Sequence, residues 1–283
     1  MPDKLLHYKV LERLGEGARS FIYKVQDPNT GQIFALKHVE RKDQKDIRFI
    51  EQMETEYEVS RRFSHPNLRR SFQLKINKSM LLKVNEAFLF MELFDGMALD
   101  VELPETLVEI FDTFIQAAQG LKAMHQMDWA HCDIKPNNIL RDHSGRVKVI
   151  DFGQSCRIGT IKERIQGTPD YIAPEQVNRK PISVQTDVFN LGATLYWAVT
   201  GRHIPTMYTV KKKGGNAILS DDLFKTPQDL NPAVPPVVSN MIMQSIATSQ
   251  SKRPADMDAL IEKLEIGKHL LSRDSGGRVA SAG

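Results

Sequence analysis

The sequence has few cysteines, no long apolar run and no bias toward glycine or proline. Two cysteines in 283 residues cannot form a disulfide scaffold, so we expect a reducing compartment, the cytoplasm. No stretch approaches the ~18 apolar residues of a membrane-spanning helix. Met1 to Val10 lack the apolar run of a signal peptide, and none is expected. With only 17 glycines and 14 prolines, collagen-like and low-complexity classes are excluded.

Neither sign of charge dominates. There are 38 lysines and arginines against 35 aspartates and glutamates, a net charge of +3 that does not predict nucleic acid as a partner. The hydrophobic content of 41% and charged content of 26% are typical of a soluble globular protein. At about 150 residues per domain, the length predicts about two folding units.

The first third of the chain reads as strands around one helix. Apolar positions at helical spacing predict a helix over 44–63, which His65 and Pro66 end. Runs rich in β-formers, bounded by turn residues, predict six strands, at 8–11, 20–25, 33–39, 69–76, 79–84 and 87–92.

Later residues follow a helical pattern. Short strands are predicted near 139–140 and 147–150, and helices at 104–125, 185–200, 234–247 and 256–265. The fold class is therefore α+β. A small β-rich lobe with one helix (8–92) is joined near 92–96 to a larger helical lobe (97–265), and residues 272–283 are expected to be disordered.

Two features of the β-rich part suit phosphate binding. Gly15 and Gly17 lie between two strands, where the backbone can approach phosphates, although a plain hairpin turn is an equally good interpretation. Lys37 on the third strand suits the α- and β-phosphates of a nucleotide, although a lone strand lysine is usually only solvated. A carboxylate partner on the next helix would strengthen its case. Three glutamates there are candidates, namely Glu54, Glu56 and Glu58.

The stretch His131–Asn138 carries the strongest chemical signal. Asp133 can accept a proton from a hydroxyl nucleophile, Lys135 can neutralise charge on a group in transit, and Asn138 can hold a metal ion through its amide oxygen. Asp151 leaves an apolar strand just before Phe-Gly and is placed to bind Mg²⁺. Two ordinary polar loops are the alternative, which the joint spacing disfavours.

In these motifs the chain resembles the eukaryotic-like (Hanks-type) serine/threonine protein kinases. The resemblance covers about residues 8–265 and includes, in the family's order, His131–Asn138, Asp151–Gly153 and Gly167–Glu175. The helical half is more similar to the bacterial branch. The resemblance implies a bilobal kinase fold and transfer of the ATP γ-phosphate to serine or threonine hydroxyls of protein substrates.

The resemblance also implies a catalytic role for each motif residue. Asp133 is expected to be the catalytic base, with Lys135 and Thr168 beside it in the serine/threonine-specific pattern. Asn138 and Asp151 are expected to bind two Mg²⁺ ions.

ATP contacts follow from the same resemblance. Lys37 is expected to contact phosphates and to pair with Glu56, which the family spacing selects among the three glutamates. The remaining expected contacts are the glycine loop, the residues that sandwich or back the adenine, and the segment whose backbone binds it: Leu14, Gly15, Gly17, Ile22, Ala35, Met91, Glu92, Phe94 and Leu140.

Two further contacts are implied as structural. Glu175 is expected to form an ion pair with Arg253, and Asp187 is expected to cap the catalytic loop. If the ion pair is buried, loss of one partner costs about 3–5 kcal/mol.

The chain departs from the family at two positions that usually hold cations. Cys132 stands where an arginine precedes the catalytic aspartate (a non-RD kinase), and Cys156 stands where a second basic residue often binds the same loop phosphate. Two packed free thiols, in a kinase active without loop phosphorylation, are one interpretation. A redox-sensitive pair is the other.

Other function classes stay open beside the active kinase. A pseudokinase that binds nucleotide and acts as a scaffold is the main alternative, and a small-molecule kinase of related fold is another. The intact set Lys37, Asp133, Asn138 and Asp151 disfavours the first, and the segment Gly167–Glu175 disfavours the second. The sequence predicts no oligomeric state.

Overall fold

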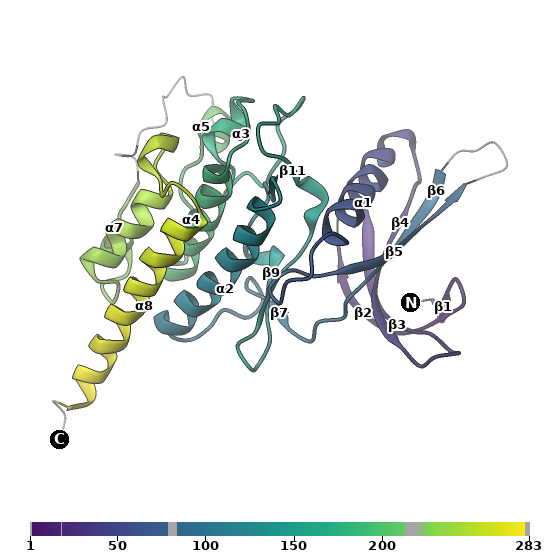
Figure 1. Ribbon diagram of the computed structural model, residues 1–283, viewed down its shortest axis with the longest axis horizontal. Helices are drawn as coiled ribbons and strands as arrows, with labels where there is room; N and C mark the ends of the chain where they lie inside the picture. Colours follow the sequence, from purple (N-terminus) through teal and green to yellow (C-terminus); the bar gives the residue numbers. More distant parts are fainter. Residues whose placement is uncertain (1, 18, 79–83, 213–220, 222–223, 281–283) are drawn as a thin grey trace. The chain divides into compact units, whose positions relative to one another are not determined.

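The computed structural model describes residues 2–17, 19–78, 84–212, 221 and 224–280, and the chain divides into two units (Figure 1). The β-rich unit comprises Met1–Asp95 and Asp151–Gln154, and the helical unit comprises Gly96–Ile150 and Ser155–Gly283. The predicted α+β class with a β-rich first part and a mainly helical second part is confirmed.

The β-rich unit is built on one antiparallel sheet of six strands, in the order β1-β2-β3-β4-β6-β5. The strands are β1 (Lys4–Leu5), β2 (Tyr8–Glu16), β3 (Ser20–Gln26), β4 (Ile33–Glu40), β5 (Ser71–Lys78) and β6 (Val84–Met91). Five of the six predicted strands lie within or overlap these elements. For the sixth, 79–84, residues 79–83 lie outside the described residues and Val84 begins β6.

Alternation along the strands gives the sheet two apolar faces. One face buries Tyr23, Val25 and Leu36, and the other buries Ala35 and Val39 with α1 (Ile47–Ser60). A 3₁₀ turn (Gln44–Asp46) precedes this helix, and the side chains of Asp43 and Asp46 form a capping box at the start of that turn. Ile50 and Met53 of the helix pack into the apolar cluster on this face of the sheet, and Glu56 is buried on the same helix.

The helical unit is organised around two long helices, the amphipathic α2 (Leu107–His125) and the almost wholly buried α4 (Val184–Thr200). The other helices are α3 (Pro174–Val177), α5 (Met207–Lys212), α6 (Pro227–Leu230), α7 (Pro236–Ser245) and α8 (Met257–Ala280). The four predicted helices correspond to α2, α4, α7 and α8. No helix among the described residues is long and apolar enough for a membrane span.

Short strands in the helical unit flank the segment 131–138. β7 (Met97–Ala98), β9 (Ile139–Arg141) and β10 (Val147–Val149) form one small sheet, and β8 (Trp129–Ala130) pairs with β11 (Cys156–Arg157) in another. The segment 131–138 therefore begins directly after β8 and ends directly before β9, so both its ends are fixed.

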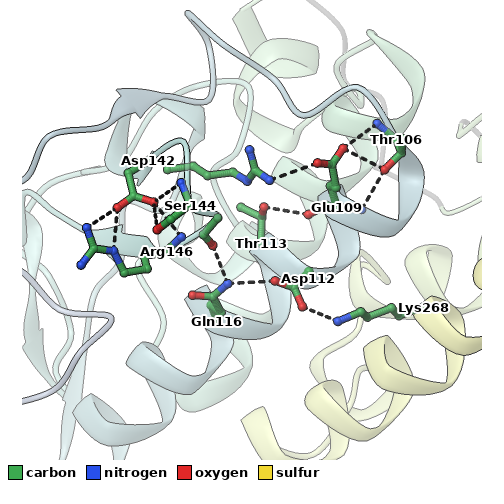
Figure 2. A network of polar contacts seen from close by, with 11 residues as sticks. Thr106, Glu109, Asp112, Thr113, Gln116, Asp142, Ser144, Arg146 and Lys268 are labelled. Carbon is green, nitrogen blue, oxygen red and sulfur yellow. Dashed lines mark hydrogen bonds and ion pairs between the residues drawn. The ribbon is translucent and has the colours of Figure 1, made fainter.

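Polar side chains tie α2 to the β9–β10 turn (Figure 2). Gln116 of α2 donates to the Gly145 carbonyl at 2.8 Å and accepts from the Val147 amide at 3.2 Å. Within the turn, Asp142 accepts hydrogen bonds from Ser144 and Arg146. Burial raises the pKa of Asp142, but these hydrogen bonds outweigh it and lower that pKa to about 2.

Helix α8 packs along α2 beyond the expected end of the domain at 265. Asp112 of α2 pairs with Lys268, Gly267 lies against Phe111, and Leu271 is buried. The helix continues to Ala280, where the sequence led us to expect disorder from 272, and residues 281–283 lie outside the described residues. Extending a packed helix is far less costly than nucleating one, which explains helix in a Gly/Ser-rich segment.

Candidate functional site

In the β-rich unit, Lys37 lies between two carboxylates. From β4, its Nζ is 2.6 Å from Glu56 Oε2 on α1 and 3.3 Å from Asp151 Oδ1. Glu56 is 1% exposed and Lys37 15%. This arrangement is a pre-formed cationic group on a rigid strand, with its stem buried and its ammonium held in one place.

Charge balance keeps Lys37 protonated. Burial alone lowers the pKa of Lys37, but the carboxylates of Asp151 and Glu56 outweigh burial and raise that pKa above its ordinary value. Lys37 is therefore a cation throughout the physiological pH range.

The structure decides among the three glutamates of α1. Glu56 faces Lys37, Glu54 is exposed, and Glu58 pairs with Arg61 and Arg62 on the helix surface. The choice of Glu56 made from the family spacing is thus the one that the structure shows in contact with Lys37.

One charged member of this cluster was missed from the sequence. The Arg69 guanidinium, 7% exposed, lies 3.6 Å from the second Glu56 oxygen, Oε1. Glu56 therefore has a cation on each oxygen. Arg69 stands next to Arg70 in a polar stretch after Pro66, so no local pattern distinguished it.

The expected nucleotide contacts of the sheet occupy neighbouring ladder positions. Ile22 is opposite both Gly15 and Lys37, and Ala35 is opposite Met91. Ala35 and Met91 are buried in the α1-side cluster and Ile22 packs against it. These registers bring the apolar candidates and Lys37 onto adjoining strands.

The remaining candidates are placed as follows. Leu14 is exposed on β2, and the Gly17 amide donates to Ser20 O at 2.7 Å, which closes the turn. The Glu92 amide donates to Arg70 O at 2.9 Å, and Phe94 is half-buried. Leu140 is half-buried on β9 of the helical unit, paired with Ala98 and Lys148.

In the helical unit, Asp133, Lys135 and Thr168 form a closed triad of contacts. Thr168 Oγ1 donates to Asp133 Oδ1 at 2.8 Å, Lys135 Nζ donates to Thr168 Oγ1 at 3.1 Å, and Lys135 Nζ lies 3.3 Å from Asp133 Oδ2. The structure thus brings together the three residues predicted as catalytic. A carboxylate held between a hydroxyl and an ammonium keeps its acceptor oxygens in a fixed orientation.

Asn138 lies beside this triad. Its Nδ2 donates to the Asp133 carbonyl oxygen at 2.8 Å, so the amide oxygen is the atom that could bind a cation. The described residues contain no group of three or more His, Cys, Asp or Glu side chains that could hold a metal ion. An ion held through Asn138 or Asp151 would need oxygen ligands from a bound molecule such as a phosphate.

Asp187 of α4 holds the backbone before Asp133. It accepts from the amides of His131 and Cys132, each at 2.8 Å, and lies 2.8 Å from His125 Nε2. Burial raises the pKa of Asp187, but these hydrogen bonds and the nearby histidines lower it below its ordinary value. The predicted capping of this loop by Asp187 is confirmed.

Two positions here have left-handed backbones. The φ angles of Cys132 and Asp151 are 67° and 64°. Such strain in residues other than glycine persists only where the surroundings determine the conformation, and it concentrates at functional sites. Gly153, just after Asp151, is needed for close packing, because a Cβ there would be 3.1 Å from Gln52 O.

The predicted pair of Glu175 and Arg253 forms and is buried. Two hydrogen bonds of 2.7 and 3.0 Å join the guanidinium to the carboxylate, and the two side chains are 0% and 3% exposed. Arg253 also lies over the Phe189 ring. The pair is structural, because both side chains are buried and Arg253 also donates to the carbonyls of Gln185 and Ala247.

Gln176 is a connecting residue that the sequence did not reveal. Its Nε2 donates to Cys132 O at 2.8 Å and to Gln166 O at 3.2 Å, and its Oε1 accepts from Ala173 N and Asn190 Nδ2. One buried amide therefore joins the loop before Asp133 to the segment 166–176. Gln176 lies in a four-residue helix, too short to leave a periodic pattern in the sequence.

Cys132 and Cys156 face each other at the end of the β8–β11 ladder. Their Sγ atoms are 3.7 Å apart, with Cys132 fully buried and Cys156 partly exposed. Ala130, Ile158 and Ile182 pack around them. The two thiols therefore lie in a mainly apolar site.

Comparison with known proteins places these geometries in a family. A protein kinase domain model matches residues 8–264. The chain is 32% identical over 254 residues to putative sperm motility kinase W of Mus musculus. The aligned region covers 89% of this chain and 48% of the relative. The chain is 30% identical to CBL-interacting protein kinase 11 of Oryza sativa subsp. japonica, covering 73% of this chain and 42% of the relative.

A third relative, serine/threonine-protein kinase TIO of Arabidopsis thaliana, is 34% identical over 71% of this chain and 15% of its own length. The chain spans less than two thirds of each of these relatives. The expected similarity of the helical half to the bacterial branch of the family stays a prediction.

Proposed function

The chain belongs to the protein kinase domain family, and from that premise we propose that it transfers the γ-phosphate of ATP to serine or threonine hydroxyls of proteins. The observation that carries this proposal is the triad of Asp133, Lys135 and Thr168 in the helical unit. The hydroxyl and the ammonium orient the carboxylate, and an oriented carboxylate can accept the proton of a hydroxyl nucleophile.

Asp133 acts as the base in this proposal. The Thr168 hydroxyl and the Lys135 ammonium orient its carboxylate, and Asp187 fixes the backbone just before it. A substrate hydroxyl that approaches Asp133 is oriented by the carboxylate and gives up its proton to it as the bond to phosphorus forms. A positioned base contributes about 10²–10⁴-fold in rate.

Lys135 and Thr168 complete the acceptor site. Lys135 neutralises charge on the transferring phosphoryl group, while Thr168 links the loop of Asp133 to the segment that ends at Glu175. This link supports the assignment to serine/threonine specificity, because a hydroxyl at 168 contacts the base directly.

Nucleotide and metal binding fall to a separate set of side chains. Lys37, held by Glu56, is assigned to the α- and β-phosphates, while Asn138 and Asp151 are assigned to magnesium. Bound Mg²⁺ supplies charge neutralisation on the phosphates, and one or two protein oxygens suffice because the phosphates provide others. The donor set fits this, since Asn138 and Asp151 offer hard oxygen ligands and no protein cage is present among the described residues.

Cys132 makes the chain a non-RD kinase within this proposal. No cation at 132 is available to grip a phosphorylated residue, and the segment before Thr168 is already held through Gln176. We therefore propose activity without phosphorylation of that segment.

The competing function is a pseudokinase scaffold. The intact contacts of Lys37 with Glu56 and of Thr168 with Asp133 favour catalysis over it. The proposal includes protein substrates in a reducing, cytoplasmic setting, which the absence of a disulfide between the two cysteines supports.

Incubation of the purified chain with Mg²⁺ and γ-labelled ATP, alone and with a generic protein acceptor, tests the function. We expect label on serine and threonine, lost in Asp133→Asn, while that variant still binds Mg-ATP. Nucleotide binding without transfer in the wild type would establish the scaffold. Transfer to small molecules but not to proteins would establish a metabolite kinase.

A further inference from the structure

We propose that Cys132 and Cys156 are a modification site at which a hydroperoxide forms a reversible intramolecular disulfide. The inference goes beyond the proposed kinase function and does not depend on it, because it concerns only thiol chemistry in the helical unit. It begins from the 3.7 Å separation of the two sulfur atoms.

Geometry supports closure with small movement. A disulfide bond is about 2.0 Å long, so the sulfur atoms must approach by less than 2 Å. Antiparallel pairing puts Cys156 opposite Ala130, two residues before Cys132, which holds the two chain segments side by side. The approach therefore needs adjustment of side chains and of one short strand, not a rearrangement of the fold.

One partner is fixed and the other can move. The Cys132 amide donates to Asp187, and its carbonyl accepts from Gln176. Cys156 lies on a two-residue strand that leads to Gly159, and its side chain is only partly buried. Cys156 is therefore the thiol that an oxidant reaches and that shifts toward the fixed Cys132.

The electrostatics give the two thiols different roles. The hydrogen bond between the two thiols and the nearby cation of Lys162 lower the pKa of the Cys156 thiol. The same hydrogen bond and complete burial raise the pKa of Cys132. Cys156 is thus the attacking thiolate, and Cys132 is the resolving thiol.

The reaction balances with a hydroperoxide as the two-electron oxidant. The Cys156 thiolate attacks the terminal peroxide oxygen, an S–O bond forms, the O–O bond breaks, and the leaving alkoxide or hydroxide takes up a proton. Cys132 sulfur then attacks the sulfenic sulfur, the S–S bond forms, and hydroxide leaves with the Cys132 proton as water. Two thiols are oxidised and one peroxide is reduced to an alcohol, or water, and one further water.

The chain offers a clean test because these are its only two cysteines. The reduced 283-residue chain is treated with a small excess of hydrogen peroxide, quenched, denatured and analysed for free thiols and by peptide mass spectrometry. We expect both thiols to disappear together, with one cross-linked peptide pair within a single chain. Dithiothreitol should restore both.

Two variants separate the steps. In Cys132→Ala, peroxide should leave Cys156 as a sulfenic acid that a 1,3-dione captures. In Cys156→Ser, Cys132 should keep its thiol over the same time. The unfolded wild type in denaturant serves as a further control, in which disulfide formation should be at least about tenfold slower because the fold no longer aligns the thiols.

The proposal would be overturned by retention of both thiols, by over-oxidation of Cys156 without a cross-link, or by a disulfide only between chains. A folded wild type that cross-links no faster than the unfolded chain would do the same. None of these results depends on phosphotransfer, so failure here and failure of the proposed function are distinguishable.

Discussion

The two polar clusters of the molecule are built in opposite ways. In the β-rich unit, Glu56 and Lys37 neutralise each other inside the core, and Arg69 adds a second cation. In the helical unit, the backbone on either side of Asp133 carries the fixed contacts, while the Lys135 side chain is 22% exposed. A change at Glu56 is therefore expected to affect both phosphotransfer and stability, whereas a change at the Asp133 carboxylate is expected to affect phosphotransfer alone.

The largest effect is expected at the second cluster. Asp133→Asn should lower the phosphotransfer rate by about 10²–10⁴-fold, because the amide cannot accept the substrate proton. Its thermal midpoint should stay close to that of the wild type, since the backbone contacts remain. Rates with labelled ATP and calorimetry check both parts.

Asp258→Asn is the matched control, because Asp258 is an exposed carboxylate of α8 with a surface partner. It should leave both the rate and the midpoint unchanged. If Asp133→Asn unfolds the helical unit, the Asp133 carboxylate is needed for stability and the expected difference between the two clusters is wrong.

A purely structural ion pair should show the next largest effect. Arg253→Leu leaves the Glu175 carboxylate buried without its cation, and we expect a loss of about 3–5 kcal/mol in the free energy of unfolding. The adjacent Lys252 is 69% exposed, so Lys252→Leu should change stability by less than about 0.5 kcal/mol. Urea unfolding of the two variants provides the measurement, and equal values would contradict a buried pair.

Glu56→Gln tests whether loss of one carboxylate in the Lys37 cluster affects both phosphotransfer and stability. The amide keeps a polar contact but removes the carboxylate beside Arg69 and leaves Lys37 with Asp151 alone, so we expect about 1–3 kcal/mol of destabilisation together with slower phosphotransfer. Glu54→Gln, on the exposed face of the same helix, should alter neither quantity. If Glu56→Gln slowed phosphotransfer without lowering stability, the expected difference between the two clusters would be wrong.

The smallest effect is a dependence on pH. The folded-state pKa of Asp142 is about 2, below its ordinary value near ~3.9, so its stabilisation is present above about pH 4 and is lost as the pH falls toward 2. Asp142→Asn should therefore be less stable than the wild type at pH 6, with the difference shrinking between pH 4 and pH 2. Denaturant midpoints across this range check the sign, and a constant difference would contradict it.

Local patterns explain which parts of the fold could be predicted. Alternation and helical spacing predicted the strands and the long helices, because a buried face leaves a period in the sequence. The two-residue strands β8 and β11 have no such period. Their pairing, which brings Cys156 near Cys132, comes from tertiary contacts alone.

The site shows the same division. The resemblance to protein kinases implied Asp133, Lys135 and Thr168 as one group, and the structure places them in contact. Arg69 and Gln176 were not predicted, because each works through a partner distant in sequence. Residues whose contacts are distant in sequence leave no local pattern, and the folded structure is needed to identify them.

The packing of α8 against α2 limits how far the C-terminus of this protein can be shortened in a folded fragment. The family match ends at residue 264, yet Gly267 sits where a Cβ would come within 2.6 Å of the Phe111 ring, and Leu271 is 4% exposed. A recombinant fragment cut at the family boundary would uncover the aromatic face of α2 and invite aggregation. Expression trials are best started with a C-terminus no earlier than Leu271.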